Sequence, residues 1–203
     1  VELVATSNFS FLRGGSHPEE LALTAAALNL QGIGLCDRNS FAGVVRAYVA
    51  LRDTDIPTPK TFRYLVGTRL VFADGTPDIV VYPTYRAADG NLCRLLTNRQ
   101  MRAKKGECIL YKNDLIEWQE GLLLTTLPPN TKNGAKVENN LSAKNELIQH
   151  LKEFRAVAPD RVWLGATMPR KGPDKRRLKA LARIAALARV PLIATNDALY
   201  HVP

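Results

Sequence analysis

The sequence predicts an α/β protein in which mostly parallel strands form a sheet or barrel with helices packed outside it. Short apolar runs alternate along the chain with longer segments whose apolar residues recur at helical spacing. About seven such strands fit into the 203 residues, and 46% hydrophobic with 23% charged residues is an ordinary globular composition. A compact β/α barrel and an open doubly wound sheet both satisfy this pattern.

The first strand is expected over residues 2–6, and a polar loop follows it. A helix should begin near Ser16, which can cap it, because Pro18 suits a first turn and Glu19 lies at the capping-box position. The apolar run 33–36 then predicts a buried strand. This order of strand, helix and strand is the start of a parallel β/α unit.

The same alternation continues to the end of the chain. Asp74-Gly75 separates two apolar runs and predicts a tight hairpin turn between them. The remaining expected strands cover residues 65–72, 79–82, 122–127, 162–166 and 191–195. The remaining expected helices cover residues 41–51, 85–102, 114–118, 141–155 and 174–188, and the polar stretch 130–140 is expected to be loop. Because no internal repeat and no linker interrupts the pattern, residues 1–203 are expected to form one domain.

Several classes of protein are excluded by simple features of the sequence. No apolar run approaches the ~18 residues of a membrane span, and no leader-like segment opens the chain. The three cysteines stand far apart without a CxxC pair, which argues against a disulfide scaffold and fits a cytoplasmic protein. Phosphate-binding loop, dinucleotide-binding and zinc-protease motifs are all missing.

The chain is strongly basic, with 28 Lys and Arg against 19 Asp and Glu, a net charge of +9 and a pI near 9.7. Such a surface favours polyanions, and two basic clusters are the candidate DNA-binding residues. They comprise Arg99, Arg102, Lys104 and Lys105 in one segment, and Arg176, Lys179 and Arg183 on one face of an expected helix. The alternative is that both clusters are solvated surfaces without a ligand.

Polar residues follow the expected strands at their carboxyl ends, where parallel sheets gather their chemistry. Asp37-Arg38, Arg69 and Asn196-Asp197 occupy such positions and are candidates for a phosphate or metal rim. The alternative is that Asp and Asn there cap the following helices. With three histidines in the chain, a metal centre built mainly on imidazoles would have few ligands.

One long motif resembles a known family. Residues 7–21 read SNFSFLRGGSHPEEL, and residues 37–47, 92–97, 105–107 and 194–201 carry further matches in the same order. Together they resemble the PHP (polymerase and histidinol phosphatase) domain of bacterial C-family DNA polymerases, most closely the error-prone relatives of the DNA polymerase III α subunit. This resemblance implies a distorted seven-stranded (β/α)7 barrel of PHP type, with parallel strands and outer helices.

The resemblance also implies where a trinuclear metal centre would lie in an active PHP domain. Its ligand positions and their surroundings fall here on Val4, Thr6, Asp37, Arg38, Arg69, Asp197, Leu199 and His201. Val and Leu cannot bind a metal, and Arg is a permanent cation that repels one. We therefore expect a degenerate cleft without metal, cofactor or catalytic residue, in which the two Asp pair with Arg38, Arg69 or the backbone.

The function that the resemblance implies is that of an N-terminal, non-catalytic PHP domain in an error-prone DNA polymerase acting in damage-induced translesion synthesis. The expected partners are the palm and thumb of the remaining chain, weakly bound DNA, and, through the parent, a sliding clamp and mutagenesis accessory proteins; no membrane is expected. The first alternative is an active, metal-dependent PHP phosphoesterase or 3′–5′ exonuclease. A second alternative is a stand-alone nucleic-acid-binding module.

Overall fold

The computed structural model describes residues 1–56, 61–104, 107–129, 140–168, 170 and 172–202. The chain divides into two compact units, and the first is assembled from both ends of the sequence. The first unit comprises Val1–Arg69 and Thr195–Pro203, and the second comprises Leu70–Ala194. The expected polar loop 130–140 lies almost entirely outside the described residues.

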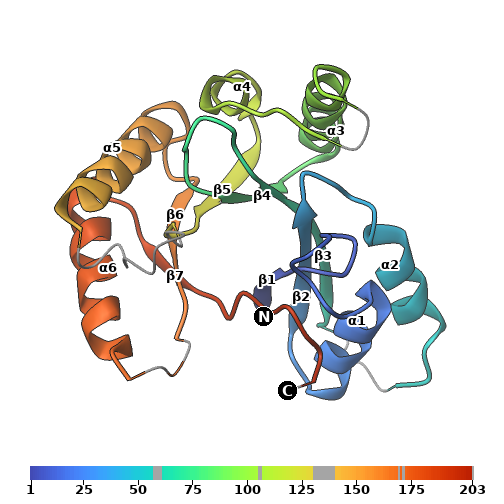
Figure 1. Ribbon diagram of the computed structural model, residues 1–203. Helices are drawn as coiled ribbons and strands as arrows, with labels where there is room; N and C mark the ends of the chain where they lie inside the picture. The colour runs from blue at the N-terminus through green and yellow to red at the C-terminus, as the bar shows by residue number, and fades with distance from the viewer. Residues whose placement is uncertain (57–60, 105–106, 130–139, 169, 171, 203) are drawn as a thin grey trace. The chain divides into compact units, whose positions relative to one another are not determined.

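Parallel strands with two helices build the first unit. Strand β1 (Glu2–Ala5) pairs with β2 (Gly32–Arg38), which pairs residue by residue with β3 (Arg63–Leu70). Helices α1 (Pro18–Ala27) and α2 (Val44–Asp53) pack side by side in this unit (Figure 1). Its buried core consists of Ala5, Leu21, Ala22, Ala25, Ile33, Leu35 and Ala47. The small alanines let the two helices approach closely.

The start of α1 differs by one residue from the expectation. His17, and not Ser16, is the residue before the first helical turn, and its backbone N–H donates to Oε2 of Glu20 at 2.7 Å. Pro18 occupies the first helical position as expected. Ser16 is displaced from the capping role because its hydroxyl contacts Nδ1 of His201 at 2.7 Å.

Four strands and four helices form the described part of the second unit. The strands are β4 (Ile79–Pro83), β5 (Leu122–Thr126), β6 (Val162–Ala166) and β7 (Leu192–Ala194). The helices are α3 (Arg86–Met101), α4 (Lys112–Trp118), α5 (Leu141–Val157) and α6 (Asp174–Ala188). Leu147, Leu151 and Phe154 of α5 are fully buried at helical spacing, so this helix presents one apolar stripe to the core.

The predicted fold class is confirmed, with one exception in strand direction. Seven strands follow one another in chain order, and the pairs β5–β6 and β6–β7 are parallel like those of the first unit. The expectation of parallel strands is wrong for β4 and β5, which are antiparallel. Two successive helices, α3 and α4, lie between these strands and contact each other, where a parallel β/α unit has one helix. With the second helix the chain reverses direction one more time, so β5 runs opposite to β4.

The expected tight hairpin at Asp74-Gly75 is a turn inside a longer connection. Strand β3 ends at Leu70 and β4 begins at Ile79, so the two central residues do not join the strands directly. Gly75 has the left-handed φ of +83° that a turn needs. Asp74 holds the connection, because its carboxylate accepts from the backbone N–H groups of Thr76 at 3.1 Å and Lys112 at 2.8 Å.

None of the helices in the described part of the chain is both long and apolar enough to cross a lipid bilayer.

The half-buried imidazole of His150 makes the stability of the second unit sensitive to pH. Its ring stacks on Phe154, and burial, followed by the positive charge of Lys112, lowers the pKa of His150 below 6.5. Because the unfolded chain then binds more protons than the folded chain as the pH falls through 6.5, stability decreases in acid. Replacing His150 with Gln should flatten the pH profile of the melting temperature in this range. Parallel profiles in the two proteins would contradict this assignment.

Candidate functional site

A buried carboxylate, Asp37, lies near the end of β2 and is held by hydroxyl and amide donors. Oδ1 accepts from the backbone N–H of Ser7 at 2.9 Å and from the Ser10 hydroxyl at 2.8 Å. The Ser7 hydroxyl lies 2.9 Å from Oδ1 and 2.8 Å from Oδ2. Since Asp37 is only 2% exposed, these donors from the loop after β1 replace the water that a carboxylate would otherwise need.

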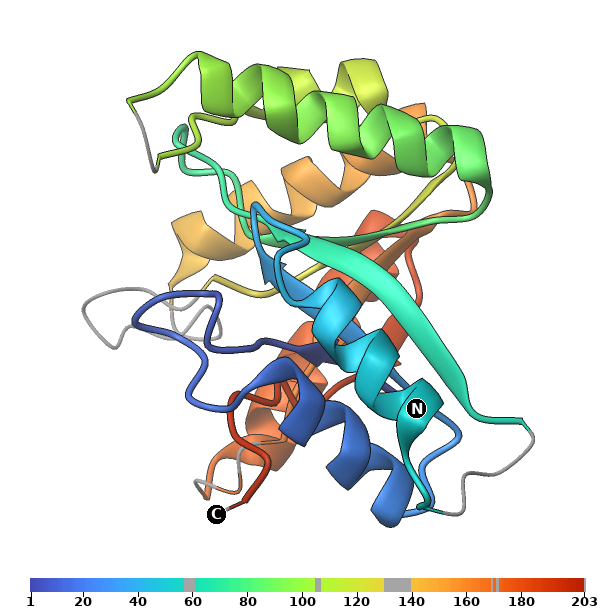
Figure 2. The same ribbon diagram turned by 90° about the vertical axis from the view of Figure 1, so that its right-hand side faces the viewer.

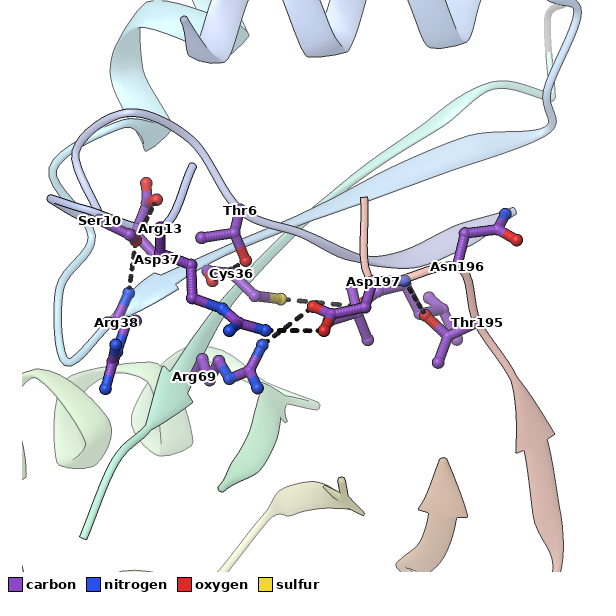
Figure 3. Close-up of polar contacts among 12 residues, drawn as sticks. Thr6, Ser10, Arg13, Cys36, Asp37, Arg38, Arg69, Thr195, Asn196 and Asp197 are labelled. Carbon is purple, nitrogen blue, oxygen red and sulfur yellow. Dashed lines mark hydrogen bonds and ion pairs between the residues drawn. The ribbon is translucent and has the colours of Figure 1, made fainter. Parts of the chain in front are cut away.

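Arg38 does not pair with Asp37, contrary to one of the expected pairings. Successive residues of a strand point to opposite faces, which separates the two side chains. The side chain of Arg38 is exposed and forms no ion pair with any residue that the structure describes. Its backbone N–H donates to the Ser10 hydroxyl at 2.9 Å (Figure 3), so Ser10 bridges the two residues at the end of the strand.

The second carboxylate, Asp197, accepts from two guanidinium groups. Nη1 of Arg69 lies 2.9 Å from Oδ1, and Nη2 of Arg13 lies 2.8 Å from Oδ2 (Figure 3). The Arg69 side chain is 7% exposed, so Asp197 compensates a cation that has little access to water. The expected Arg69–Asp197 pair is confirmed. The contribution of Arg13 was not predicted, although it is the one charged residue in the loop 7–15 of the family-like motif.

The positions that the resemblance assigns to histidine ligands have structural roles. Val4 is fully buried, and Thr6, also buried, directs its hydroxyl to the carbonyl of Cys36 at 3.4 Å. The backbone of these two residues pairs with Ala198 through Ala198 N–H to Val4 O at 2.8 Å and Thr6 N–H to Ala198 O at 2.9 Å. The Leu199 carbonyl accepts from Gly15 N–H at 2.9 Å. This final segment is therefore attached to β1 and its loop by backbone bonds.

Glu2 is a further buried carboxylate, and the sequence pattern did not predict its part in the site. It is 6% exposed and accepts from the Thr195 hydroxyl at 2.6 Å, Asn196 N–H at 2.9 Å and Val4 N–H at 2.7 Å. The strand period of two places Glu2 on the same face as Val4 and Thr6. That spacing was the available signal, but a Glu at a strand start is ordinarily exposed.

The histidines near the cleft are engaged elsewhere. Nδ1 of His201 lies 2.7 Å from the Ser16 hydroxyl and 3.5 Å from Oε2 of Glu20. Nδ1 of His17 lies 2.8 Å from the side-chain nitrogen of Asn8. These contacts hold the loop and the final segment to the start of α1.

The residues present do not fit the trinuclear metal centre that the resemblance assigns to active PHP domains. Within the described ranges, no group of three or more His, Cys, Asp or Glu side chains is placed to hold a metal ion. Both oxygens of Asp197 already accept from guanidinium groups, and both oxygens of Asp37 accept from hydroxyls. A divalent cation here would also meet the fixed charges of Arg13 and Arg69.

The two basic clusters differ in how their charges are used. Arg99 is 9% exposed and lies 3.1 Å from the Asp114 carboxylate, which also pairs with Arg102 at 3.2 Å. Arg102 additionally stacks over the ring of Tyr111. Arg99, Arg102 and Asp114 therefore form an ion-pair cluster with a structural role. Lys104 is exposed, and Lys105 lies outside the described residues. By contrast, Arg176, Lys179 and Arg183 of α6 are all exposed.

The fold is similar to the PHP- and amidohydrolase-type barrel-like folds of two solved structures. A protein described as a metal-dependent phosphoesterase from Bifidobacterium adolescentis superposes with a TM-score of 0.63 at 14% identity, covering 98% of this chain and 87% of that one. An amidohydrolase from Chromobacterium violaceum, with bound sulfate and no metal, gives a TM-score of 0.66 at 14% identity and the same coverages. No family model matches the sequence.

Sequence relatives specify the class further: the chain is homologous, over its full length, to a segment of bacterial error-prone DNA polymerases. It is 50% identical to the error-prone DNA polymerase of Brucella abortus over 203 residues, which is 100% of this chain and 18% of the polymerase. The corresponding proteins of Rhodopseudomonas palustris and Caulobacter vibrioides are 48% and 45% identical over 202 residues, each match covering 100% of this chain and 17% of the polymerase. The chain thus spans about a fifth of the length of these relatives.

Removing the Asp197 carboxylate, which Arg13 and Arg69 share, should destabilise the fold because the Arg69 guanidinium is buried. We expect Asp197→Ala to lower the free energy of unfolding by about 2 kcal/mol, because Arg69 loses its charged partner while remaining in a buried position. The measurement is urea unfolding followed by circular dichroism. Asp53→Ala is the matched control, since Asp53 pairs with Arg52 on the open surface and its loss should leave the midpoint unchanged. Equal midpoint shifts in the two variants would contradict the structural role of Asp197.

Proposed function

We propose that this chain is the PHP-type part of an error-prone DNA polymerase and that its former hydrolytic cleft has become a structural element. The observation that carries the proposal is the pairing of Asp197 with both Arg13 and Arg69. The identity of 43–50% to segments of error-prone DNA polymerases supports the parent assignment.

The chemistry of the cleft supports a non-catalytic role. Metal-dependent hydrolysis needs a cation that lowers the pKa of a bound water and stabilises the charge on the phosphate. Arg13 and Arg69 supply positive charge, but a guanidinium neither binds water as a ligand nor releases a proton near neutral pH. Asp37 is 2% exposed and accepts from Ser7 and Ser10, so it is poorly placed to act as a general base.

In the parent polymerase, this segment supports the palm and thumb and has no share in nucleotide transfer. The parent acts in damage-induced translesion DNA synthesis in the cytoplasm, together with a sliding clamp and mutagenesis accessory proteins. The similarity to segments of error-prone DNA polymerases supports this role. The competing function is an active PHP phosphoesterase or 3′–5′ exonuclease. The similar fold of the protein described as a metal-dependent phosphoesterase is the reason to test this alternative.

The chain purified without chelator should contain no stoichiometric zinc, manganese or iron by elemental analysis. It should also hydrolyse neither p-nitrophenyl phosphate nor the 3′ end of an oligonucleotide when manganese is added. The reason is that Asp37 and Asp197 are already occupied by protein donors. Asp37→Asn serves as the control for contaminating hydrolases. A manganese-dependent activity that disappears in this variant would overturn the proposal in favour of the exonuclease.

The basic surface of helix α6 favours a second function, weak binding of DNA. Helix α6 exposes Lys175, Arg176, Lys179 and Arg183, and its one acidic residue, Asp174, is buried. None of these four cations forms an ion pair with a residue in the described ranges. Such a row of free cations on one helix suits the phosphate backbone of DNA and carries no information about base sequence.

The 203-residue chain should bind single- and double-stranded oligonucleotides with a dissociation constant of about tens of micromolar or weaker at physiological salt. Replacing Lys179 and Arg183 together with Ala should weaken binding and reduce the salt slope on duplex DNA by about 2, because two phosphate contacts are lost. Fluorescence anisotropy at two salt concentrations measures both quantities. The matched control is the double variant Arg86→Ala with Arg94→Ala, which removes two exposed cations from α3. Equal losses in both double variants would show that binding follows net charge and not α6.

A further inference from the structure

Two adjacent large apolar side chains stand in solvent at the tip of the loop 7–15 that follows β1. Phe11 is 84% exposed and Leu12 is 91% exposed. Leu12 also has a left-handed φ of +59°, a conformation that residues other than glycine adopt infrequently. Figure 2 shows this loop, in dark blue, extending away from β1. An exposed apolar tip with an unusual backbone needs an explanation beyond the folding of this unit.

Backbone hydrogen bonds fix the conformation of the loop although the side chains at its tip are exposed. Three backbone bonds close it, from Ser10 N–H to Ser7 O at 3.0 Å, Arg13 N–H to Ser10 O at 2.9 Å and Gly14 N–H to Ser10 O at 3.2 Å. A Cβ on Gly14 would lie 2.1 Å from the Ser7 carbonyl oxygen, so only glycine permits this closure. The loop is therefore preorganised, and a partner would not have to order it on binding.

The side-chain anchors of the loop are the two carboxylates of the degenerate cleft. Asp37 holds its first half through the hydroxyls of Ser7 and Ser10, and Asp197 holds its second half through Arg13. The positions that the resemblance assigns to metal binding are thus used to fix the loop on both sides of Phe11 and Leu12.

We propose that the Phe11–Leu12 tip docks this segment onto the remaining part of the polymerase chain, and that Asp37 and Asp197 serve to present it. This inference rests on the proposed function, because it needs a polymerase that extends beyond the segment. Its partner surface is an apolar pocket or groove in the same polypeptide, of a size that accepts one phenylalanine and one leucine side chain.

The placement of the final segment favours a partner in the same chain. Residues 197–201 are attached to the loop through Asp197 to Arg13, Leu199 O to Gly15 N–H and His201 to Ser16. In the relatives, about four-fifths of the polypeptide lies outside the matched part. Any chain that continues after residue 203 starts beside this loop and meets its tip at a high effective concentration.

Two other partners fit the tip less well. A stable homodimer needs about 1,000 Å² of buried area, and two side chains on a loop supply a small part of it, whereas an intramolecular contact has no such requirement. A DNA partner would favour several free cations beside the aromatic ring. Arg13, the one cation of the loop, is already paired with Asp197, and Arg38, whose backbone N–H donates to Ser10, adds a single exposed one.

Photo-cross-linking in the full-length gene product tests the proposal. A benzoylphenylalanine is placed at position 11, the purified protein is irradiated at low concentration, and the cross-linked peptides are identified by mass spectrometry. We expect a cross-link within one chain to a peptide beyond residue 203. The same group at position 28 is the control, because Leu28 is also exposed, at 67%, but lies at the end of α1; it should give at least fivefold less product.

The outcomes separate the two proposals. A gene product whose mass shows that it ends at residue 203 would overturn the parent assignment and the docking proposal together. With a full-length polymerase in hand, a cross-link at position 11 to a second copy or to added DNA, or no cross-link above the Leu28 control, would overturn the docking proposal alone.

A companion variant tests the role of the carboxylate anchors. Ser10→Ala removes the hydroxyl that joins the loop to Asp37, and we expect it to reduce the cross-link yield at position 11 several-fold. Ser40→Ala is the matched control, because the Ser40 hydroxyl accepts from Ala42 N–H in a separate turn; its yield should not change. Melting temperatures of both variants show whether the fold is retained. Equal yields from Ser10→Ala and Ser40→Ala in folded protein would contradict the anchoring role.

Discussion

The first unit depends on one buried charge and the carboxylate that neutralises it. Arg69 has almost no access to water. The ion pair with Asp197 offsets part of the free energy that burying its guanidinium group costs. The same carboxylate accepts from Arg13 and so fixes the loop after β1, while the backbone around Ala198 pairs with β1. One residue therefore connects a strand end, a loop and the final segment.

This arrangement disfavours the introduction of metal ligands one residue at a time. Replacing Arg69 with a metal-binding carboxylate would put a second acidic group beside Asp197, with Arg13 as the cation that remains, and like-charge repulsion disfavours this. Restoring ligands at Val4 or Thr6 would put polar side chains into buried positions without partners. Each single step costs stability before any metal could offset it.

The sequence predicted the secondary structure well because local patterns decide it. The helix expected over residues 141–155 and the strand expected over residues 162–166 agree with the observed α5 and β6. The antiparallel direction of β5 could not be predicted in the same way, because it depends on how α3 and α4 route the chain.

Side-chain partners distant in sequence were the least accessible part of the site. Arg13 and Asp197 are 184 positions apart, so no local pattern joins them. Arg99 belongs to a basic cluster in the sequence that is typical of DNA-binding segments, yet in the structure it forms an ion pair with Asp114. The hydroxyls around Asp37 were equally hidden, since serines in a loop usually face water. The resemblance supplied the positions of the cleft but not the contacts that replaced its ligands.

The discontinuous make-up of the first unit has a consequence for synthesis on the ribosome. Its strands β1 to β3 emerge early, but Glu2 and Arg69 find their partners Thr195 and Asp197 only after the whole second unit has been translated. The second unit, Leu70–Ala194, is continuous in sequence and can fold as it emerges. Until then the nascent first unit lacks the Asp197 carboxylate that Arg69 contacts, which makes this interval the stage at which chaperones have most to protect.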